Sequence, residues 1–245
     1  MIPDSEILLA AACIVTIAYT VFGLTGFGSS ITAMPFLVQW LPLKVAVPLM
    51  LLLDMCTGLL LLSRNRRHAQ LNEIVPLLPF MVLGCVLGLT LLVQVNERAL
   101  LLALGAFVLS YAAWSLLLRP AVRPIARGWS LPFGTAGGVF TALFGTGGPI
   151  YAVYLARRIT DKNCLRASLA TLVLISAFVR LALFAWAGIL FQSEVGITAA
   201  LALPFALAGL WAGSKLHVRL PAKHVVRGTW AVLIAGALGL VLRNL

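Results

Sequence analysis

The chain has 245 residues, of which 62% are hydrophobic and only 10% are charged, and its formal net charge is +11. A soluble domain usually has about a quarter of its residues charged, so this composition excludes an ordinary water-soluble protein and indicates that lipid surrounds most of the chain. An excess of Lys and Arg is expected at the cytoplasmic ends of membrane helices. We therefore predict the lipid bilayer, and not nucleic acid, as a partner of this chain.

Long apolar runs separated by short polar loops predict an all-α, polytopic membrane protein. A spanning helix needs roughly 20 apolar residues. Two of the runs, 29–41 and 148–156, are too short to span, and each follows a glycine-rich break, Thr25–Ser30 in one case and Phe144–Pro149 in the other. The predicted helical segments, in chain order, are 7–24, 29–41, 45–63, 74–94, 99–118, 130–144, 148–156, 167–190, 196–214 and 228–242.

Basic residues gather in four loops between these segments. The loops hold three, three, four and four Lys or Arg residues, which is 14 of the 18 in the chain. They are marked by Arg64, Arg119, Arg158 and Lys215. Because Lys and Arg are enriched in cytoplasmic loops, we predict that all four face the cytoplasm and that both termini lie outside.

Two parts of the chain resemble each other. The pattern L-P-F-x3-G-x3-G occurs at Leu78–Gly88 and again at Leu203–Gly213, and the glycine-rich breaks correspond at an offset of 119, which pairs Gly26 with Gly145. The charge distribution assigns each half one hairpin and three spans. Because three crossings is an odd number, the second half must enter the membrane upside down, which is the inverted-topology repeat found in many secondary transporters. The glycines four residues apart are predicted to let helices pack closely.

These observations predict two repeats in one membrane domain. Residues 1–118 form the first repeat, whose hairpin covers 7–41. A cytoplasmic linker follows at 119–129. Residues 130–245 form the second, inverted repeat, whose hairpin covers 130–156. Each repeat therefore consists of a glycine-broken helical hairpin and three transmembrane helices.

The two breaks are the predicted site for a substrate. Glycines interrupt a helix without side chains that would block a ligand, and a helix that restarts after a break points free N–H groups at the gap, which favours an anion. The alternative is that the breaks are only tight hairpin turns. The predicted substrate-binding residues are Thr25, Gly26, Gly28, Ser29, Ser30, Gly145, Thr146, Gly147 and Gly148, with the hydroxyl groups as additional donors.

Two charged residues lie inside predicted spans, Asp54 in 45–63 and Arg180 in 167–190. Insertion scales put such a residue at about 2.5–3.5 kcal/mol at a helix centre, so either one is a candidate functional residue. The internal repeat places them about one helical turn apart on equivalent helices. They can pair with each other, or Arg180 can attract the anion while Asp54 exchanges a proton. A structural ion pair, or an arginine that snorkels to the surface, is the alternative without a transport role.

No residues suited to catalysis or metal binding occur in the predicted spans. They contain no histidine pair, no carboxylate pair and no H-E-x-x-H motif, and the four cysteines show no metal spacing. We therefore predict that the protein is not an enzyme and that it has no cofactor and no metal site. Because no nucleotide-binding motif is present, transport would depend on gradients. An anion channel and a membrane assembly factor are alternatives to a transporter, and the sequence does not specify whether a homo-oligomer forms.

The order of the motifs resembles a known family. The first break is followed by Lys44-Val-Ala-Val, and the second, Gly145–Pro149, is followed by Leu165–Thr171. Together with the repeated L-P-F-x3-G-x3-G pattern, this order is similar to that of the TauE/SafE family of membrane transporters, or sulfite exporters, over residues 7–243. The resemblance implies a bacterial inner-membrane permease for a small, often sulfur-containing anion such as sulfite or an organosulfonate. The two breaks differ in sequence, so the resemblance does not imply a symmetric site.

Overall fold

The computed structural model describes residues 5–65, 68–117, 124–191, 193–219, 234 and 236–243. All regular structure in these residues is helical, as the sequence predicts. The helices are α1 Ser5–Thr25, α2 Ser29–Leu37, α3 Leu43–Asn65, α4 Leu71–Ile74, α5 Leu78–Gln94, α6 Glu97–Leu117, α7 Ser130–Phe144, α8 Gly148–Leu155, α9 Lys162–Trp186 and α10 Ser193–Arg219, with 3-10 turns η2 Val75–Leu77, η3 Arg127–Trp129 and η4 Ile189–Phe191. Residues 236–243 are also helical.

Five of the described helical segments are long and apolar enough to cross a membrane: Leu43–Leu61, Leu71–Gln94, Glu97–Ser115, Lys162–Trp186 and Val195–Leu216. The burial of their most apolar stretches separates them into two groups. In the segments of α3 and α9, 67% and 61% of these stretches are buried inside the protein, against 39%, 33% and 28% for the segments that contain α5, α6 and α10. Helices α3 and α9 therefore form the centre of the molecule, and the other three have broad apolar faces that suit contact with lipid.

Most helix boundaries agree with the sequence prediction, and α7 matches its predicted range of 130–144. Helix α9 begins at Lys162, five residues before the predicted start, because the Asp161 carboxylate accepts a hydrogen bond of 2.7 Å from the Cys164 amide and caps the helix. This bond also lowers the pKa of Asp161. The helix ends at Trp186, just before Gly188 turns the backbone into the left-handed region at φ 73°. Much of the predicted segment 228–242 lies outside the described residues.

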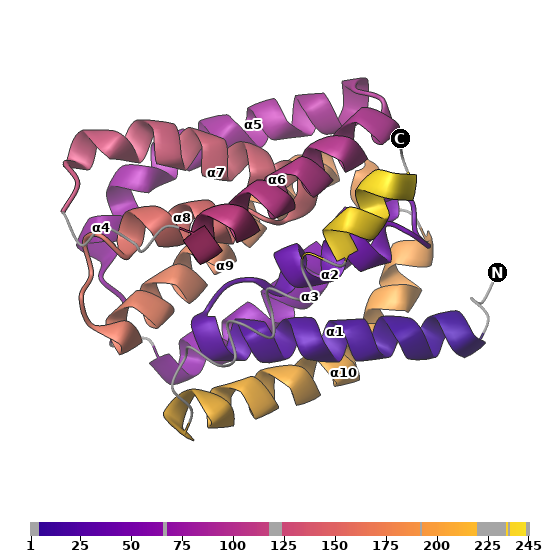
Figure 1. The fold of residues 1–245 in the computed structure, drawn as a ribbon, viewed down its shortest axis with the longest axis horizontal. Helices are drawn as coiled ribbons and strands as arrows, with labels where there is room; N and C mark the ends of the chain where they lie inside the picture. The colour runs from indigo at the N-terminus through magenta and orange to yellow at the C-terminus, as the bar shows by residue number, and fades with distance from the viewer. Residues whose placement is uncertain are drawn as a thin grey trace.

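The long helices lie side by side and run between the two ends of the molecule (Figure 1). Helix α1 packs along α10, α5 packs along α7, and α3 packs against α9. The start of α1 and the helical residues 236–243 lie at the same end. Each of these three helix pairs therefore joins a helix from the first half of the chain to one from the second half.

Glycines permit the close approach of α5 to α7. A Cβ atom on Gly84 would lie 2.9 Å from the Gly138 Cα atom and would also collide with the Thr135 carbonyl oxygen. A Cβ atom on Gly88 would lie 2.6 Å from the Val139 carbonyl oxygen. Because the obstructing atoms are backbone atoms that cannot rotate away, the structure confirms the prediction that these glycines allow close packing.

A second pair of glycines plays the same part between α10 and α1. A Cβ atom on Gly209 would collide with the Thr16 carbonyl oxygen, and one on Gly213 would collide with that of Thr20. The Gly213 Cβ position also lies 3.0 Å from the Gly23 Cα atom. The two copies of the repeated sequence pattern thus make the same kind of helix contact at two separate places.

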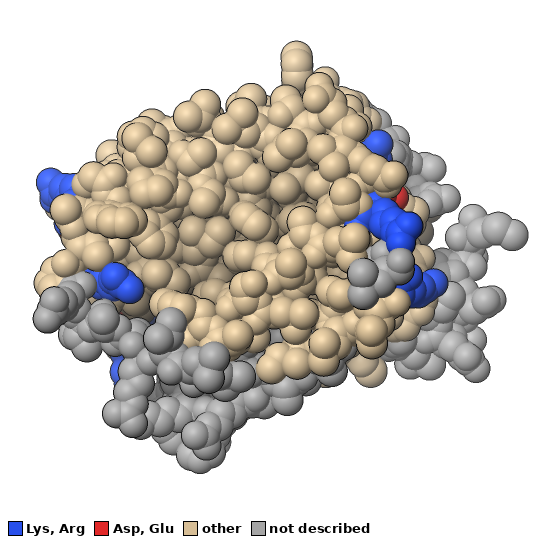
Figure 2. Space-filling model, turned by 45° about the horizontal axis from the view of Figure 1, so that its top comes forward, with Lys and Arg blue, Asp and Glu red and all other residues tan. Residues whose placement is uncertain are grey.

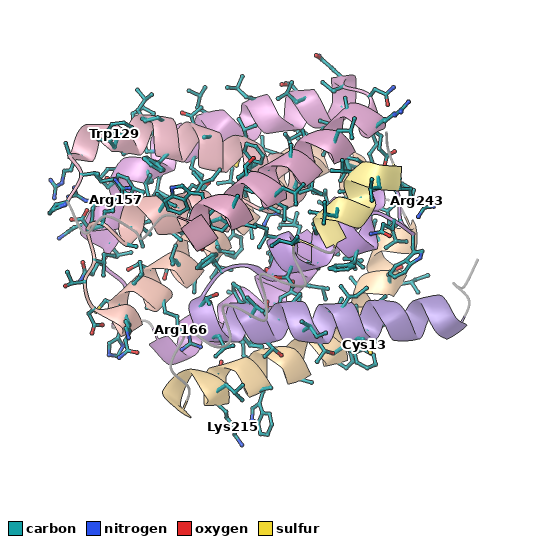
Figure 3. All side chains as sticks on the ribbon, viewed as in Figure 1. Cys13, Trp129, Arg157, Arg166, Lys215 and Arg243 are labelled. Atoms are coloured by element: carbon teal, nitrogen blue, oxygen red, sulfur yellow. The ribbon has the colours of Figure 1, made fainter. Side chains whose placement is uncertain are left out.

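Charged side chains lie mainly at the two ends of the molecule. In the face that Figure 2 shows, Lys and Arg residues occupy both ends and a broad expanse of uncharged residues separates them. Arg157, Arg166 and Lys215 lie toward the end that carries Trp129, and Arg243 lies at the opposite end (Figure 3). This distribution matches that of a protein whose middle is surrounded by hydrocarbon and whose ends are in contact with water.

A guanidinium group ties several segments together at the first of these ends. Arg158 forms a salt bridge with Glu73, at the start of the span that leads into α5, and its Nη1 atom donates a hydrogen bond of 2.6 Å to the Ile125 carbonyl oxygen. Its guanidinium carbon lies 5.8 Å from the ring centroid of Tyr154 on α8. The hydrogen bond to Glu73 raises the pKa of Arg158 above its usual value. These contacts hold α4, the segment before α7 and the end of α8 in one arrangement.

Candidate functional site

The first helix break separates α1 from α2. Gly26 and Gly28 have φ values of 81° and 98°, in the left-handed region that L-residues with side chains rarely adopt. The Thr25 hydroxyl oxygen lies 2.9 Å from the Val21 carbonyl oxygen and 2.5 Å from that of Phe27, so its one hydrogen is directed to the backbone. The backbone of this turn therefore engages Thr25, although the sequence proposed it as a donor to substrate.

The second break separates α7 from α8 and has a similar form. Helix α7 ends at Phe144 and is followed by Gly145, which has a φ of 72°. The Gly145 and Thr146 amides donate to the carbonyl oxygens of Thr141 and Phe140 at 2.8 and 3.2 Å. Helix α8 begins at Gly148, and Pro149 occupies its first turn, where a missing N–H group has no cost. Both breaks thus end one helix with a left-handed glycine and start a short second helix.

The two breaks lie against each other inside the protein. A Cβ atom on Gly148 would lie 2.9 Å from the Phe27 Cβ atom, and one on Gly145 would lie 2.5 Å from the Ser30 hydroxyl oxygen. The Gly145 position is also 3.3 Å from the Nη1 atom of Arg180. Ser30, Gly145 and Arg180, which come from three separate parts of the sequence, therefore meet at one place.

Asp54 on α3 accepts hydrogen bonds from several hydroxyl groups at the same place. Its Oδ1 atom accepts from the Tyr19 hydroxyl at 2.8 Å and from the Ser29 hydroxyl at 2.7 Å, and its Oδ2 atom accepts from the Ser30 hydroxyl at 3.3 Å. The Nη2 atom of Arg180 lies 3.5 Å from Oδ2. Both charged side chains are only 1% exposed. The two charges predicted from the apolar spans are therefore an ion pair in the interior, and Arg180 does not snorkel to the surface.

The described part of the protein supplies few hydrogen-bond acceptors to the Arg180 guanidinium. Its single contact with Asp54 is at the outer limit of a hydrogen bond, and its Nε and Nη1 atoms are buried without a partner among the described residues. The Thr146 hydroxyl, next to Gly145 in the chain, is likewise buried without a partner there. A buried donor without an acceptor costs free energy, and a charged donor costs more. The site therefore presents unused donors and positive charge, a combination that suits an anion with several oxygen atoms.

The predicted site residues do not all face this point. A Cβ atom on Gly147 would contact Thr141 and the Gly137 carbonyl oxygen, and one on Gly26 would contact Arg166, so these two glycines allow close packing of the turns. The atoms nearest to a Cβ atom on Gly28 belong to Val21, Thr25 and Ile31, which lie on the same hairpin. The contacts instead join Ser29, Ser30, Gly145, Asp54 and Arg180, with Thr146 adjacent.

Sequence reasoning did not identify Tyr19 as part of the site. Its side chain is fully buried on α1, and its hydroxyl makes one of the two shortest hydrogen bonds to Asp54. A single tyrosine in an apolar helix is common enough to carry no signal of its own. Tyr151 on α8 was also missed, and its hydroxyl lies 3.3 Å from that of Thr141 beside the second break. In the described residues no group of three or more His, Cys, Asp or Glu side chains could hold a metal ion.

These features define a polytopic helical membrane protein with a buried, partly unsatisfied ion pair where two broken helices meet. The sequence profile of the sulfite exporter TauE/SafE family matches residues 10–240, which is nearly the whole chain. The chain belongs to this family of membrane transporters, as the order of its motifs indicated.

A named relative covers most of the same region. The chain is 29% identical over 195 residues to the "Probable inner membrane transporter protein TsaS" of Comamonas testosteroni, and the match covers 78% of this chain and 81% of that protein. No solved structure matches the chain.

Proposed function

We propose that the protein is a secondary transporter of the bacterial inner membrane that carries a small sulfur-containing oxyanion, of the sulfite or organosulfonate class, and holds it at Arg180 between the two helix breaks. The observation that carries this proposal is the buried guanidinium, whose Nε and Nη1 atoms have no partner among the described residues. An oxyanion would supply both the missing acceptors and a compensating charge. The description of the family, sulfite exporter, supports the substrate class, and the name of the Comamonas relative supports the inner membrane.

The surroundings of Arg180 suit such a ligand. Gly145 leaves the Nη1 side of the guanidinium open, because it has no side chain there. The Ser30 hydroxyl lies at Gly145, and the next residue, Thr146, has a buried hydroxyl without a partner among the described residues, so both are candidate donors to the ligand. Helices α2 and α8 start at the two breaks, and neither has a hydrogen-bonded side-chain cap. Their first amide groups can therefore add to the attraction for negative charge.

The proposed architecture is a pair of inverted repeats divided at residues 119–129, and the glycine contacts support it. The contact of Gly84 with Thr135 and the contact of Gly209 with Thr16 involve the same repeat positions, with the two halves exchanged. Each half therefore packs its first helix on a helix of the other half, as a two-fold relation between the halves requires. Asp54 and Arg180 lie on the equivalent central helices α3 and α9, where substrate sites of such transporters are expected.

The binding part of this proposal predicts selective stabilisation of the purified protein by its ligand. Thermal unfolding in detergent would be followed with sulfite, sulfate, thiosulfate, methanesulfonate or acetate. A ligand that binds only the folded state stabilises it by about 2.7 kcal/mol at a hundred times its dissociation constant. We expect stabilisation by sulfite or methanesulfonate and little by acetate. Stabilisation by none of these anions would contradict the proposal.

The effect should depend on Arg180. Replacing Arg180 with Gln is expected to weaken anion binding by at least about tenfold, or about 1.4 kcal/mol, because the guanidinium charge is lost. Replacing it with Lys should be milder, since the charge remains but the planar fork of donors does not. Arg157→Gln, at the end of the molecule, is the control and should bind the anion normally. Equal binding by Arg180→Gln and wild type would place the anion elsewhere.

A further inference from the structure

Asp54 and Arg180 form an isolated neutral pair in the interior. Among the described residues, the buried charged side chains are these two, and each is 1% exposed. Their charges sum to zero. Helices α2 and α7 carry no ionisable residue, and α10 carries none between Val195 and Gly213. The titratable groups that contact the pair are thus the two members themselves and Tyr19 of α1. Two further titratable groups, Tyr151 of α8 and Cys85 of α5, are near enough to Arg180 to interact electrostatically with its charge.

An anion at Arg180 would disturb this balance. With Asp54 ionised, the loaded site would hold two negative charges and one positive charge away from water, and an uncompensated buried charge is strongly unfavourable. One proton on Asp54 would restore neutrality. The empty site and the site loaded with one monoanion and one proton would then both be neutral.

The hydrogen bonds around Asp54 can accommodate that proton. Tyr19, Ser29 and Ser30 reach the carboxylate through hydroxyl groups, and a hydroxyl can accept a hydrogen bond as well as donate one. A protonated Asp54 would donate its O–H to one of these oxygens. Arg180, which Asp54 holds through one contact of 3.5 Å, would be released toward the anion. Ser30 could turn its own hydrogen toward the ligand beside Gly145.

We propose that Asp54 binds one proton whenever Arg180 binds the anion, so that a monoanion crosses the membrane together with one proton and without net movement of charge. This inference rests on the proposed anion transport and adds its coupling ion. The single covalent change is the O–H bond of Asp54, which forms with a proton from water on one side and breaks to water on the other. A proton gradient would therefore drive transport, and the membrane potential would not.

The test uses the full-length protein in liposomes that contain a pH-sensitive dye. Radiolabelled methanesulfonate is the probe, because it stays a monoanion throughout the neutral range and carries no proton of its own. We expect one proton to enter per methanesulfonate, and the initial rate to be unchanged by a valinomycin-imposed potassium potential. Uptake without proton entry, or uptake that an inside-negative potential slows, would overturn the coupling and leave anion transport intact. Absence of methanesulfonate uptake would overturn the proposed function as well.

Two variants assign the proton to Asp54. In Asp54→Asn the ratio of protons to methanesulfonate should fall from one to zero, and the remaining uptake should become sensitive to potential. Tyr19→Phe removes one donor from the carboxylate, which favours the protonated form, so half-maximal uptake should shift to higher pH at an unchanged ratio. Glu97→Gln is the control, because this carboxylate accepts from the Leu43 amide at a helix end, and its ratio and pH profile should match wild type.

The Tyr19→Phe variant keeps the inference testable if Asp54→Asn does not fold, which size-exclusion chromatography would reveal. A ratio of one that persists in a folded Asp54→Asn protein would overturn the assignment to Asp54. A pH profile of Tyr19→Phe identical to that of wild type would do the same.

Discussion

Arg180 has the largest of the fully buried side chains in the described part of the protein. Its position is unusual because the protein supplies only one long contact, from Asp54, to a group that can donate five hydrogen bonds. Removing one partner of a buried ion pair usually costs several kcal/mol of stability. A buried guanidinium with so few hydrogen-bond acceptors therefore lowers the stability of a membrane protein. The proposed anion would complete these hydrogen bonds and offset that cost.

Gly145 is predicted to be essential to this site. Gly145→Ala would force a side chain into a left-handed backbone at φ 72° and against Ser30, at 2.5 Å, so we expect loss of anion-dependent stabilisation. Gly188 provides a matched control, because it has a φ of 73° but no atom within 4 Å of its Cβ position. Both variants should lose roughly 1–2 kcal/mol of stability from backbone strain. Normal anion binding by Gly145→Ala in thermal unfolding would argue against the site.

At the scale of elements, the helix pairs are set by small residues on single faces. Helices α5 and α10 each present two glycines, four residues apart, to a neighbour from the other half of the chain. Lipid tails are as apolar as leucine, so burying apolar surface does not drive these helices together; close backbone contact does. The same contacts position α1 and α7, the helices that lead into the two breaks, within the bundle.

This packing predicts that Gly84→Ala and Gly209→Ala both destabilise the protein. Each new methyl group would collide with a carbonyl oxygen of the facing helix, and overpacking of this kind typically costs about 1–3 kcal/mol. The two losses should be similar if the repeats are equivalent. Gly196→Ala on α10 has open space and should be neutral or stabilising by up to about 1 kcal/mol. Unfolding in detergent measures all three, and tolerance of Ala at both positions would contradict the close packing.

At the scale of the whole molecule, uncharged surface lies between two charged ends (Figure 2). The two breaks and the ion pair lie inside, between α3 and α9, so a ligand there would have to reach water at one end and then at the other. The proposed inverted repeats would provide a simple way to do this, because rocking one half against the other would exchange two related arrangements. The salt bridge between Arg158 and Glu73 joins two segments at one of these ends.

The proposed topology predicts which end faces the cytoplasm. In a variant whose four native cysteines, Cys13, Cys56, Cys85 and Cys164, are replaced, a single cysteine at Arg157 or at Glu97 would be labelled in intact cells. We expect an impermeant maleimide to react with Glu97→Cys from outside, and with Arg157→Cys only after the membrane is opened, because Lys and Arg concentrate on the cytoplasmic side. Labelling of both positions from the same side would contradict the inverted repeat.

The amino-acid sequence by itself determined the class of protein, the helical segments and the places where two helices are broken. These features depend on local composition: hydrocarbon admits long apolar helices, charges collect where water begins, and glycine with proline marks the interruptions. Asp54 and Arg180 could also be found, because any charge within an apolar run is conspicuous. Only the tertiary structure decided that these two residues pair with each other, 126 positions apart, that Tyr19 joins them, and that each half packs on helices of the other. Such contacts depend on which helix faces meet, and apolar faces that all suit lipid equally well contain little information about which neighbour each will choose.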